Sequence, residues 1–280
     1  MKASMPHEVT YWKPEGSVSE TQHLVGEAPL SILVQGQPFY TGMRTPGEEI
    51  AHAAGFCLAE GLAEFAEDIV SIRYADESNP HLVQVTLSPA RWEKISSAFA
   101  EKQNHIAGFG QSPEEAAQSL TRILPPLPEG KKISLSKGFA CLDELSRHQP
   151  LRRQTHATHA TAIFTPDFEM LSLAEDAGRH NGMDKAIGRL LLDGKLDQAG
   201  VLLLSSRISF DLVQKGARAG IPVMLSVSRP TALAVRLASR LNMCLACLAR
   251  GGGGYVFCGK ERLEEFECQG DLRKKTSQKI

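Results

Sequence analysis

Residues 173–185 read Leu173-Ala174-Glu175-Asp176-Ala177-Gly178-Arg179-His180-Asn181-Gly182-Met183-Asp184-Lys185, and this polar stretch lies between two apolar runs. The run before it, Met170 to Ala174, is typical of a short buried strand. In the run after it, Ala186, Ile187 and Leu190 to Leu192 recur at helical spacing. The charged residues therefore mark a switch from strand to helix. Ligands of α/β proteins bind at such switches, outside the carboxyl ends of strands and at helix N-termini.

The second half of the chain repeats this strand-to-helix pattern. Strands are predicted at 159–164 and 169–173, which pair around the turn at 165–167, and at 200–205, 221–227 and 243–248, with 255–257 as an edge strand. Helices are predicted at 136–147, from 180 onward, at 209–219 and at 230–241. Continuous apolar strands that alternate with helices indicate a largely parallel sheet covered on both faces. We therefore expect the α/β class for this half.

The first half is predicted to be a smaller α+β domain, residues 27–130. It contains a hairpin at 28–40, a helix opened by Thr45 to Glu49 with Thr45 as its cap, strands at 69–73 and 82–87, and a helix at 89–99. The domain boundary is placed in Pro125-Pro126-Leu127-Pro128-Glu129-Gly130, so that the second domain takes residues 131–258. Residues 1–26 carry no clear period and are expected to be an irregular arm. Residues 259–280 are expected to be a polar, solvated tail.

Composition excludes several classes of protein. The 280 residues are 42% hydrophobic and 22% charged, with a formal charge of -1, which argues against bulk binding of nucleic acid or acidic membranes. No apolar run approaches the roughly 18 residues that a membrane helix needs, and the N-terminus lacks the apolar core of a signal peptide. The six cysteines are sparse, so we expect reduced thiols and a cytoplasmic protein.

Four polar clusters follow predicted strands at one edge of the sheet. They are residues 175–181 with His159 beside them, Ser205-Ser206-Arg207, Ser228-Arg229-Pro230-Thr231, and Arg250-Gly251-Gly252-Gly253-Gly254. Helix capping and turn chemistry would explain any one of them. Four at a single edge favour a site for an anionic, nucleotide-like ligand. Helix N-termini, bare glycine backbone and Arg250 all suit a phosphate group.

Other patterns have simpler explanations. Asp176, His180 and Asp184 could form a metal site, but hydrogen bonding within the switch is favoured and no zinc is expected. Cys244 and Cys247 have C-x-x-C spacing, yet they fall in an apolar strand, where such positions point to opposite faces. The loop at 104–112 is rich in small residues but matches no standard phosphate-loop spacing, and a connection between helices explains it.

Residues 175–185 closely resemble the EDxGRHNAxDK signature of the formate dehydrogenase accessory sulfurtransferases (FdhD). Companion stretches match the same family in order. They are Met43 to Gly47 with Gly55 to Gly61, His159 to Ala162, Ser205 to Ser209 with Val213 to Lys215, and Pro230 to Val235. The likeness covers about residues 27 to 258.

The resemblance implies a cytidine-deaminase-like α/β/α layered sheet in the second half, without the deaminase zinc. It also implies a cytoplasmic homodimer. The family takes persulfide sulfur from a cysteine desulfurase and passes it to the molybdenum bis(guanine dinucleotide) cofactor that formate dehydrogenase needs. GDP would mimic that ligand. The expected cofactor-binding residues are the segment implied by the family, Leu248, Ala249, Arg250, Gly251, Gly252 and Gly253, together with Asp176, Gly178, Arg179, His180, Asn181, Ser205, Ser206, Arg207, Ser228, Thr231 and His159.

The chain departs from the family at one loop. The family carries sulfur on a Cys-Gly-x-Cys-Gly pattern, and the matching stretch here is Ile106-Ala107-Gly108-Phe109-Gly110. Ile106 and Phe109 cannot form a persulfide, which requires a thiolate. Two functions stay open: a sulfurtransferase that uses Cys57, Cys141 or Cys258, and a non-catalytic cofactor-binding chaperone. A third, a deaminase, is opposed by the lack of a Pro-Cys-x-x-Cys helix.

Overall fold

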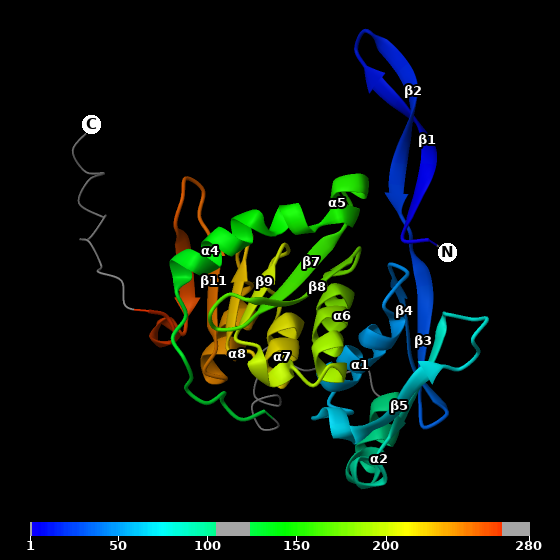
Figure 1. The fold of residues 1–280 in the computed structure, drawn as a ribbon, viewed down its shortest axis with the longest axis vertical. Helices are drawn as coiled ribbons and strands as arrows, with labels where there is room; N and C mark the ends of the chain where they lie inside the picture. The colour runs from blue at the N-terminus through cyan, green and yellow to red at the C-terminus, as the bar shows by residue number, and fades with distance from the viewer. Residues whose placement is uncertain (1, 105–123, 265–280) are drawn as a thin grey trace.

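A six-stranded mixed sheet forms the centre of the second half (Figure 1). The computed structural model describes residues 2–104 and 124–264. The strand order is β12-β11-β10-β9-β7-β8. The strands are β7 (His159–Phe164), β8 (Met170–Asp176), β9 (Val201–Leu204), β10 (Val223–Ser226), β11 (Cys244–Leu248) and β12 (Gly254–Cys258).

The α/β class is confirmed, but the expectation of a largely parallel sheet is wrong at the flanks. The predicted pairing of 159–164 with 169–173 is confirmed, because β7 pairs antiparallel with β8. Strands β9, β10 and β11 are parallel, whereas β7 also pairs antiparallel with β9, and β12 pairs antiparallel with β11. The connections from β7 to β8 and from β11 to β12 are short, and a parallel pair would need a longer crossover.

Helices lie on both faces of this sheet. On one face are α6 (Arg179–Leu192), α7 (Phe210–Arg218) and α8 (Ala232–Arg240), which share a core with Leu202 and Leu204. On the other face α4 (Leu135–Glu144) packs on Val201 and Leu203. The short helices η2 (Leu145–His148) and α5 (Pro150–Thr155) lead from α4 to β7, and η3 (Leu196–Gln198) leads to β9. Successive residues of β9 face opposite sides of the sheet, and helices cover both sides, so the sequence of β9 is apolar throughout.

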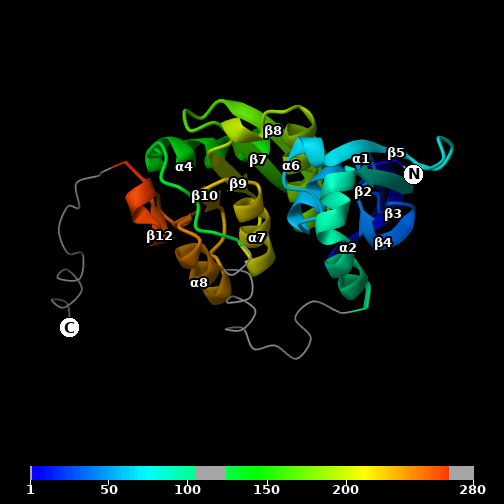
Figure 2. The ribbon, with the colours of Figure 1, turned by 90° about the horizontal axis from the view of Figure 1, so that it is seen from below.

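The first half forms the predicted α+β lobe. Its four-stranded sheet has the order β4-β3-β6-β5, with β3 (Ala28–Val34), β4 (Gln37–Arg44), β5 (Ile69–Tyr74) and β6 (Leu82–Leu87). Its helices are α1 (Glu49–Ala59), η1 (Ala66–Asp68) and α2 (Pro89–Asn104). Helix α1 lies against α6 of the second lobe (Figures 1 and 2). Its Ala53 and Phe56 pack in the core of the first lobe, while its Ala54 and Leu58 belong to the core that contains α6.

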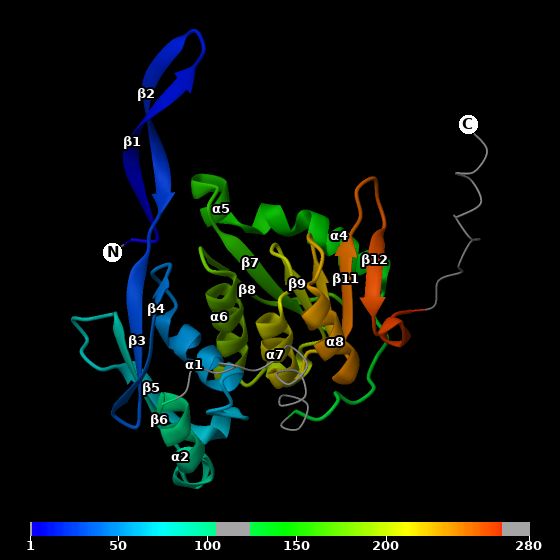
Figure 3. The same ribbon diagram turned by 180° about the vertical axis from the view of Figure 1, so that it is seen from behind.

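Residues 4–25 form a hairpin, so the expectation of an irregular arm is wrong. Strands β1 (Ser4–Lys13) and β2 (Gly16–Val25) pair antiparallel and project from the body as a ribbon (Figure 3). Both faces of the ribbon are largely exposed, so its sequence lacks the strong alternation that one buried face would impose.

The expected solvated tail is also corrected at its start, because residues 259–264 belong to the fold. Helix η4 (Lys260–Arg262) follows β12, and Leu263 forms a parallel bridge with Ile133. The Arg262 guanidinium donates to the carbonyls of Leu127 (3.0 Å) and Pro128 (2.8 Å), which ties the chain end to the predicted linker. Residues 265–280 lie outside the described part of the chain. Within the described ranges, no helix has the length and apolarity to cross a membrane.

Candidate functional site

The carboxyl ends of β8, β9, β10 and β11 meet at one edge of the sheet. The register places Asp176 opposite His159 at the start of β7. The same register aligns Ser226 at the end of β10 with Leu204 at the end of β9 and with Cys247 in β11. The four polar clusters therefore lie along one edge, as the sequence predicts.

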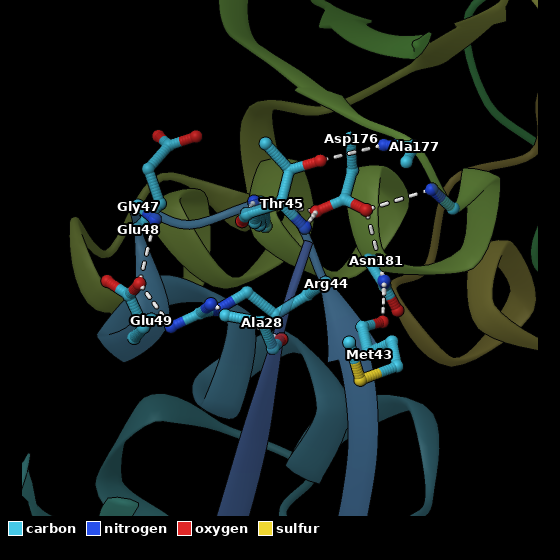
Figure 4. A network of polar contacts seen from close by, with 12 residues as sticks. Ala28, Met43, Arg44, Thr45, Gly47, Glu48, Glu49, Asp176, Ala177 and Asn181 are labelled. Atoms are coloured by element: carbon cyan, nitrogen blue, oxygen red, sulfur yellow. Dashed lines mark hydrogen bonds and ion pairs between the residues drawn. The ribbon is translucent and has the colours of Figure 1, made fainter. Parts of the chain in front are cut away.

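Asp176 is fully buried and holds the strand-to-helix switch together (Figure 4). One carboxylate oxygen accepts from the Thr45 amide at 3.0 Å and lies 2.7 Å from Lys185 Nζ. The other accepts from the Gly178 amide at 2.8 Å and from Asn181 Nδ2 at 3.1 Å. With both oxygens engaged, Asp176 maintains the shape of the edge and is inaccessible to a ligand. Asn181, also buried, has the same role.

The switch is completed by the first lobe. Lys185 Nζ donates to the Thr45 carbonyl at 2.8 Å. The Ala177 amide donates to Thr45 Oγ1 at 3.0 Å (Figure 4). Thr45 was expected to cap α1, but the N-cap residue is Glu48 and no side chain caps that helix. The two halves of the chain thus meet through a hydrogen-bond network that local sequence patterns do not reveal.

Three of the predicted ligand hydroxyls have partners within the protein. Ser205 Oγ accepts from the Ala160 amide at 2.8 Å, and Ser206 Oγ donates to the Arg207 carbonyl at 3.0 Å. Thr231 Oγ1 accepts from the Ala234 amide at 3.3 Å and caps α8. Capping and turn chemistry therefore account for these hydroxyl groups.

Four arginines lie at this edge. Arg207, Arg229 and Arg250 are exposed and Arg179 is half-buried. The nearby Glu175 carboxylate is already occupied, because it accepts the amides of Leu151 and Arg152 at the start of α5. The edge therefore presents several guanidinium groups, which is the chemistry that a phosphate group requires, and one exposed carboxylate, Asp211 at the start of α7.

Two buried nitrogen atoms at this edge, His159 Nδ1 and Arg179 Nε, have no hydrogen-bond partner among the described residues. Burial, followed by the charges of Arg152 and Arg179, lowers the pKa of His159. The imidazole is therefore neutral at neutral pH and can donate one hydrogen bond without adding charge. Unpaired buried polar atoms are uncommon in proteins, so these two atoms fit an edge that takes a polar ligand or water.

The glycine turn between β11 and β12 offers open backbone next to Arg250. Gly251, Gly252 and Gly253 have φ values of +87°, +100° and +71°, a region that disfavours other residues. A Cβ atom placed on any of the three would find nothing within 4 Å. Leu248 at the end of β11 is half-buried. A ligand can thus approach the backbone of this turn closely.

His180 faces a different space from the glycine turn. It lines a cavity of about 230 Å³ between the lobes, together with Tyr40, Asp184, Asp211 and Lys215. Lys215 Nζ lies 2.6 and 2.7 Å from the two Asp184 oxygens. Burial raises the pKa of Asp184 to about 6, and burial followed by the charges of Arg179 and Lys215 lowers the pKa of His180. No set of three or more His, Cys, Asp or Glu side chains suited to a metal occurs among residues 2–104 and 124–264.

The five described cysteines are poorly placed for sulfur transfer. Cys57, Cys244 and Cys247 are buried, and burial raises the pKa of Cys57 and of Cys244 to about 12. Cys141 and Cys258 are partly buried, and burial raises the pKa of both thiols. Since the thiolate is the nucleophile, none of these residues is activated. The loop with Ile106 and Phe109 lies outside the described residues, as does Cys268.

Sequence reasoning did not select Arg229 or Tyr255 as site residues. The Arg229 guanidinium carbon lies 5.0 Å from the centroid of the Tyr255 ring. Arg229 belongs to a polar cluster that the sequence does reveal, but Tyr255 could be read only as part of an edge strand. The antiparallel return of β12 along β11 brings the ring to the predicted edge.

The fold and the edge define a class: a two-lobed α/β protein with a basic, glycine-containing strand edge suited to an anionic ligand. The chain belongs to the FdhD/NarQ family, whose sequence model matches residues 25–264. It is 34% identical over 262 residues to the sulfur carrier protein FdhD of Streptomyces coelicolor, covering 89% of this chain and 92% of the relative. The FdhD of Mycolicibacterium paratuberculosis is also 34% identical, over 272 residues, covering 94% of this chain and 100% of the relative.

A solved structure shows the same fold. It is the crystal structure of a protein from Desulfotalea psychrophila that is described as a formate dehydrogenase accessory protein. The two chains superpose with a TM-score of 0.74 at 23% sequence identity, covering 94% of this chain and 100% of the other.

Proposed function

We propose that this chain is an accessory protein for formate dehydrogenase maturation that binds the molybdenum bis(guanine dinucleotide) cofactor as its substrate. The names of its relatives and of the similar structure support the accessory role. One observation carries the binding proposal. Four strand ends converge at an edge that presents Arg179, Arg207, Arg229 and Arg250, while the buried Asp176 is neutralised by Lys185.

The chain's own residues suggest how the ligand is held. Arg250 and the backbone of Gly251 to Gly253 are suited to a phosphate group at one end of the edge. Arg179 and the neutral His159 would donate hydrogen bonds at the other end. An extended dinucleotide can use both ends, because it lies across several strands spaced about 4.8 Å apart. The expected partners are a cysteine desulfurase and formate dehydrogenase, and the expected assembly is a homodimer.

Calorimetry with GDP tests the binding proposal. The variant Arg250→Ala should bind GDP about 5- to 30-fold more weakly than the unsubstituted chain, because a charge-assisted contact to phosphate contributes roughly 1–2 kcal/mol at a solvent-exposed site. The control is Arg240→Ala, an exposed arginine in the last turn of α8, away from the edge. Unchanged GDP affinity in Arg250→Ala would contradict the assignment of a phosphate to the glycine turn.

A second candidate function is a non-catalytic cofactor chaperone. It is favoured by the thiols, because each of the five described cysteines has a pKa raised by burial and three are inaccessible. In the sulfurtransferase reaction a thiolate attacks the terminal sulfur of the donor persulfide and the donor thiolate leaves. A thiol with a raised pKa is a poor nucleophile at neutral pH.

Persulfide trapping separates the two candidates. The full chain is incubated with a cysteine desulfurase and L-cysteine, alkylated, and analysed by mass spectrometry. A persulfide that disappears in one single variant among Cys141→Ala, Cys258→Ala and Cys268→Ala identifies a carrier and supports the sulfurtransferase. Absence of a persulfide, with GDP binding retained, supports the chaperone.

A further inference from the structure

An exposed tyrosine stands beside the glycine turn. Tyr255 lies in β12 opposite Cys247, close to the carboxyl end of β11, and is 48% exposed. The Arg229 guanidinium, from the loop that follows β10, packs on its ring with 5.0 Å between the guanidinium carbon and the ring centroid. Phe257 lies next to it on the strand, with 6.5 Å between the two ring centroids. Two neighbouring strand ends thus supply a planar cation and an aromatic ring.

Packing of the fold does not explain this pair. Val256, the residue between the two aromatics, contacts the core under α4, whereas Tyr255 and Phe257 belong to none of the three cores. Arg229 makes no ion pair with a carboxylate of the described chain. A large exposed ring next to an uncompensated guanidinium is suited to a flat, electron-rich ligand.

The surroundings indicate which flat ligand would bind. Arg250 and the three glycines with positive φ values lie in the turn that leads directly into β12. That turn has open space above its backbone. A group that carries both a planar base and a phosphate can therefore contact the ring and the turn together.

We propose that Tyr255 and Arg229 form the stacking platform for a purine base of the guanine dinucleotide, with the phosphates of the same nucleotide at the glycine turn. This inference rests on the proposed function and adds the residues that recognise the base. Stacking accounts for affinity, because each base has a π-face that an aromatic ring or a guanidinium can cover.

The test compares GDP with inorganic pyrophosphate, which lacks the base, by calorimetry on the full chain. Tyr255→Ala should weaken GDP binding by about 10- to 100-fold, the range typical of losing one base-stacking contact. Its affinity for pyrophosphate should stay within about twofold. Tyr255→Phe, which keeps the ring, should bind GDP nearly as well as the unsubstituted chain. Phe257→Ala is the matched control for loss of an exposed aromatic side chain in the same strand.

Each other outcome overturns a specific claim. If the unsubstituted chain binds GDP and Tyr255→Ala binds it equally well, the stacking platform is wrong while the proposed function stands. If GDP and pyrophosphate binding fall together, Tyr255 supports the turn and does not recognise the base. If Tyr255→Ala changes the oligomeric state in light scattering, the ring belongs to an interface between protein chains. If the unsubstituted chain does not bind GDP, the proposed function itself fails.

Discussion

Lys185 is a buried polar residue of the contact between the lobes. It is 1% exposed and pairs with the fully buried Asp176 at 2.7 Å. Lys185→Met would leave that carboxylate buried without its counter-ion, and we expect a loss of about 3–5 kcal/mol in the free energy of unfolding. Urea denaturation measures the change. Adding Asp176→Asn should recover part of the loss, because neither charge then stays buried.

The control for that experiment is an exposed ion pair. Arg147 and Glu144 form one, with side chains 75% and 48% exposed. Arg147→Ala should change the free energy of unfolding by less than about 0.5 kcal/mol. Equal losses in Lys185→Met and Arg147→Ala would show that the buried pair does not hold the lobes together.

Asp184 should give the stability of the protein a distinct pH dependence. Burial raises its pKa from 3.8 to about 6 in the folded state, so the folded chain binds more protons than the unfolded chain between these values. Its stabilising contribution is fully present below about pH 4 and is lost as the pH rises through about 6. Relative to the unsubstituted chain, Asp184→Asn should therefore gain on the order of 2 kcal/mol between pH 4 and pH 7.

Urea denaturation at several pH values checks this expectation. The control is Asp167→Asn, since the Asp167 side chain is 66% exposed and lies far from the cavity in its ion pair with Lys131. A stability difference for Asp184→Asn that does not vary with pH would show that Lys215 keeps the carboxylate ionised throughout this range.

At the scale of single residues, the sequence predicts where polar residues gather but not what each one contacts. Residue types and strand ends are local features, and they place the four clusters at one edge. Whether a hydroxyl is engaged depends on distant backbone, as with Ser205 and the Ala160 amide. The role of Thr45 depends on residue 176, which lies 131 positions away. No local pattern contains that information.

At the scale of helices and strands, the crossing of α1 and α6 depends on Gly55 in α1 and Gly188 in α6. A Cβ on Gly188 would lie 1.8 Å from the Ala51 carbonyl oxygen and 2.5 Å from the Gly55 amide nitrogen. Gly188→Ala would therefore force the helices apart, and we expect it to cost about 1–3 kcal/mol. Thermal unfolding measured by circular dichroism would show a lower Tm.

The same helix provides a matched control at Gly182. A Cβ there would meet its nearest atoms at 3.8 Å, which is ordinary contact. Gly182→Ala should leave the protein unchanged or stabilise it by up to about 1 kcal/mol, because alanine loses less conformational entropy in a helix. The FdhD signature has alanine at this position. A large destabilisation by Gly182→Ala would contradict the open space at this position of α6.

Elements with a strong hydrophobic period could be predicted, and those without one could not. Strands β9, β10 and β11 are buried on both faces and appear as continuous apolar runs. The hairpin of β1 and β2 has little buried surface, so no period marks it. The antiparallel direction of β12 was also hidden, because a strand of five residues carries no directional signal.

The two lobes share one core at the scale of the whole molecule. Ala54 and Leu58 from α1 pack among residues of α6, α7 and α8, and Ile69 and Ile72 from β5 lie against the same cluster. The sequence places a linker at 125–130. In the structure Leu127 is hydrogen-bonded to Leu241, Asn242 and Arg262 of the second lobe, so this run packs on that lobe. A proline-rich run marks a connection, but it does not show whether the parts fold separately.

A fragment of residues 131–264 tests whether the predicted boundary separates autonomous domains. Removing the first lobe would expose the face of α6 that packs on α1 and would leave Asp176 and Lys185 without Thr45. We expect the fragment to lack a cooperative unfolding transition and to bind a hydrophobic dye, whereas the full chain unfolds cooperatively. A fragment that unfolds cooperatively would show that the second lobe folds without the part of the shared core that the first lobe supplies. Its GDP affinity would then reveal whether the strand edge is formed without the first lobe.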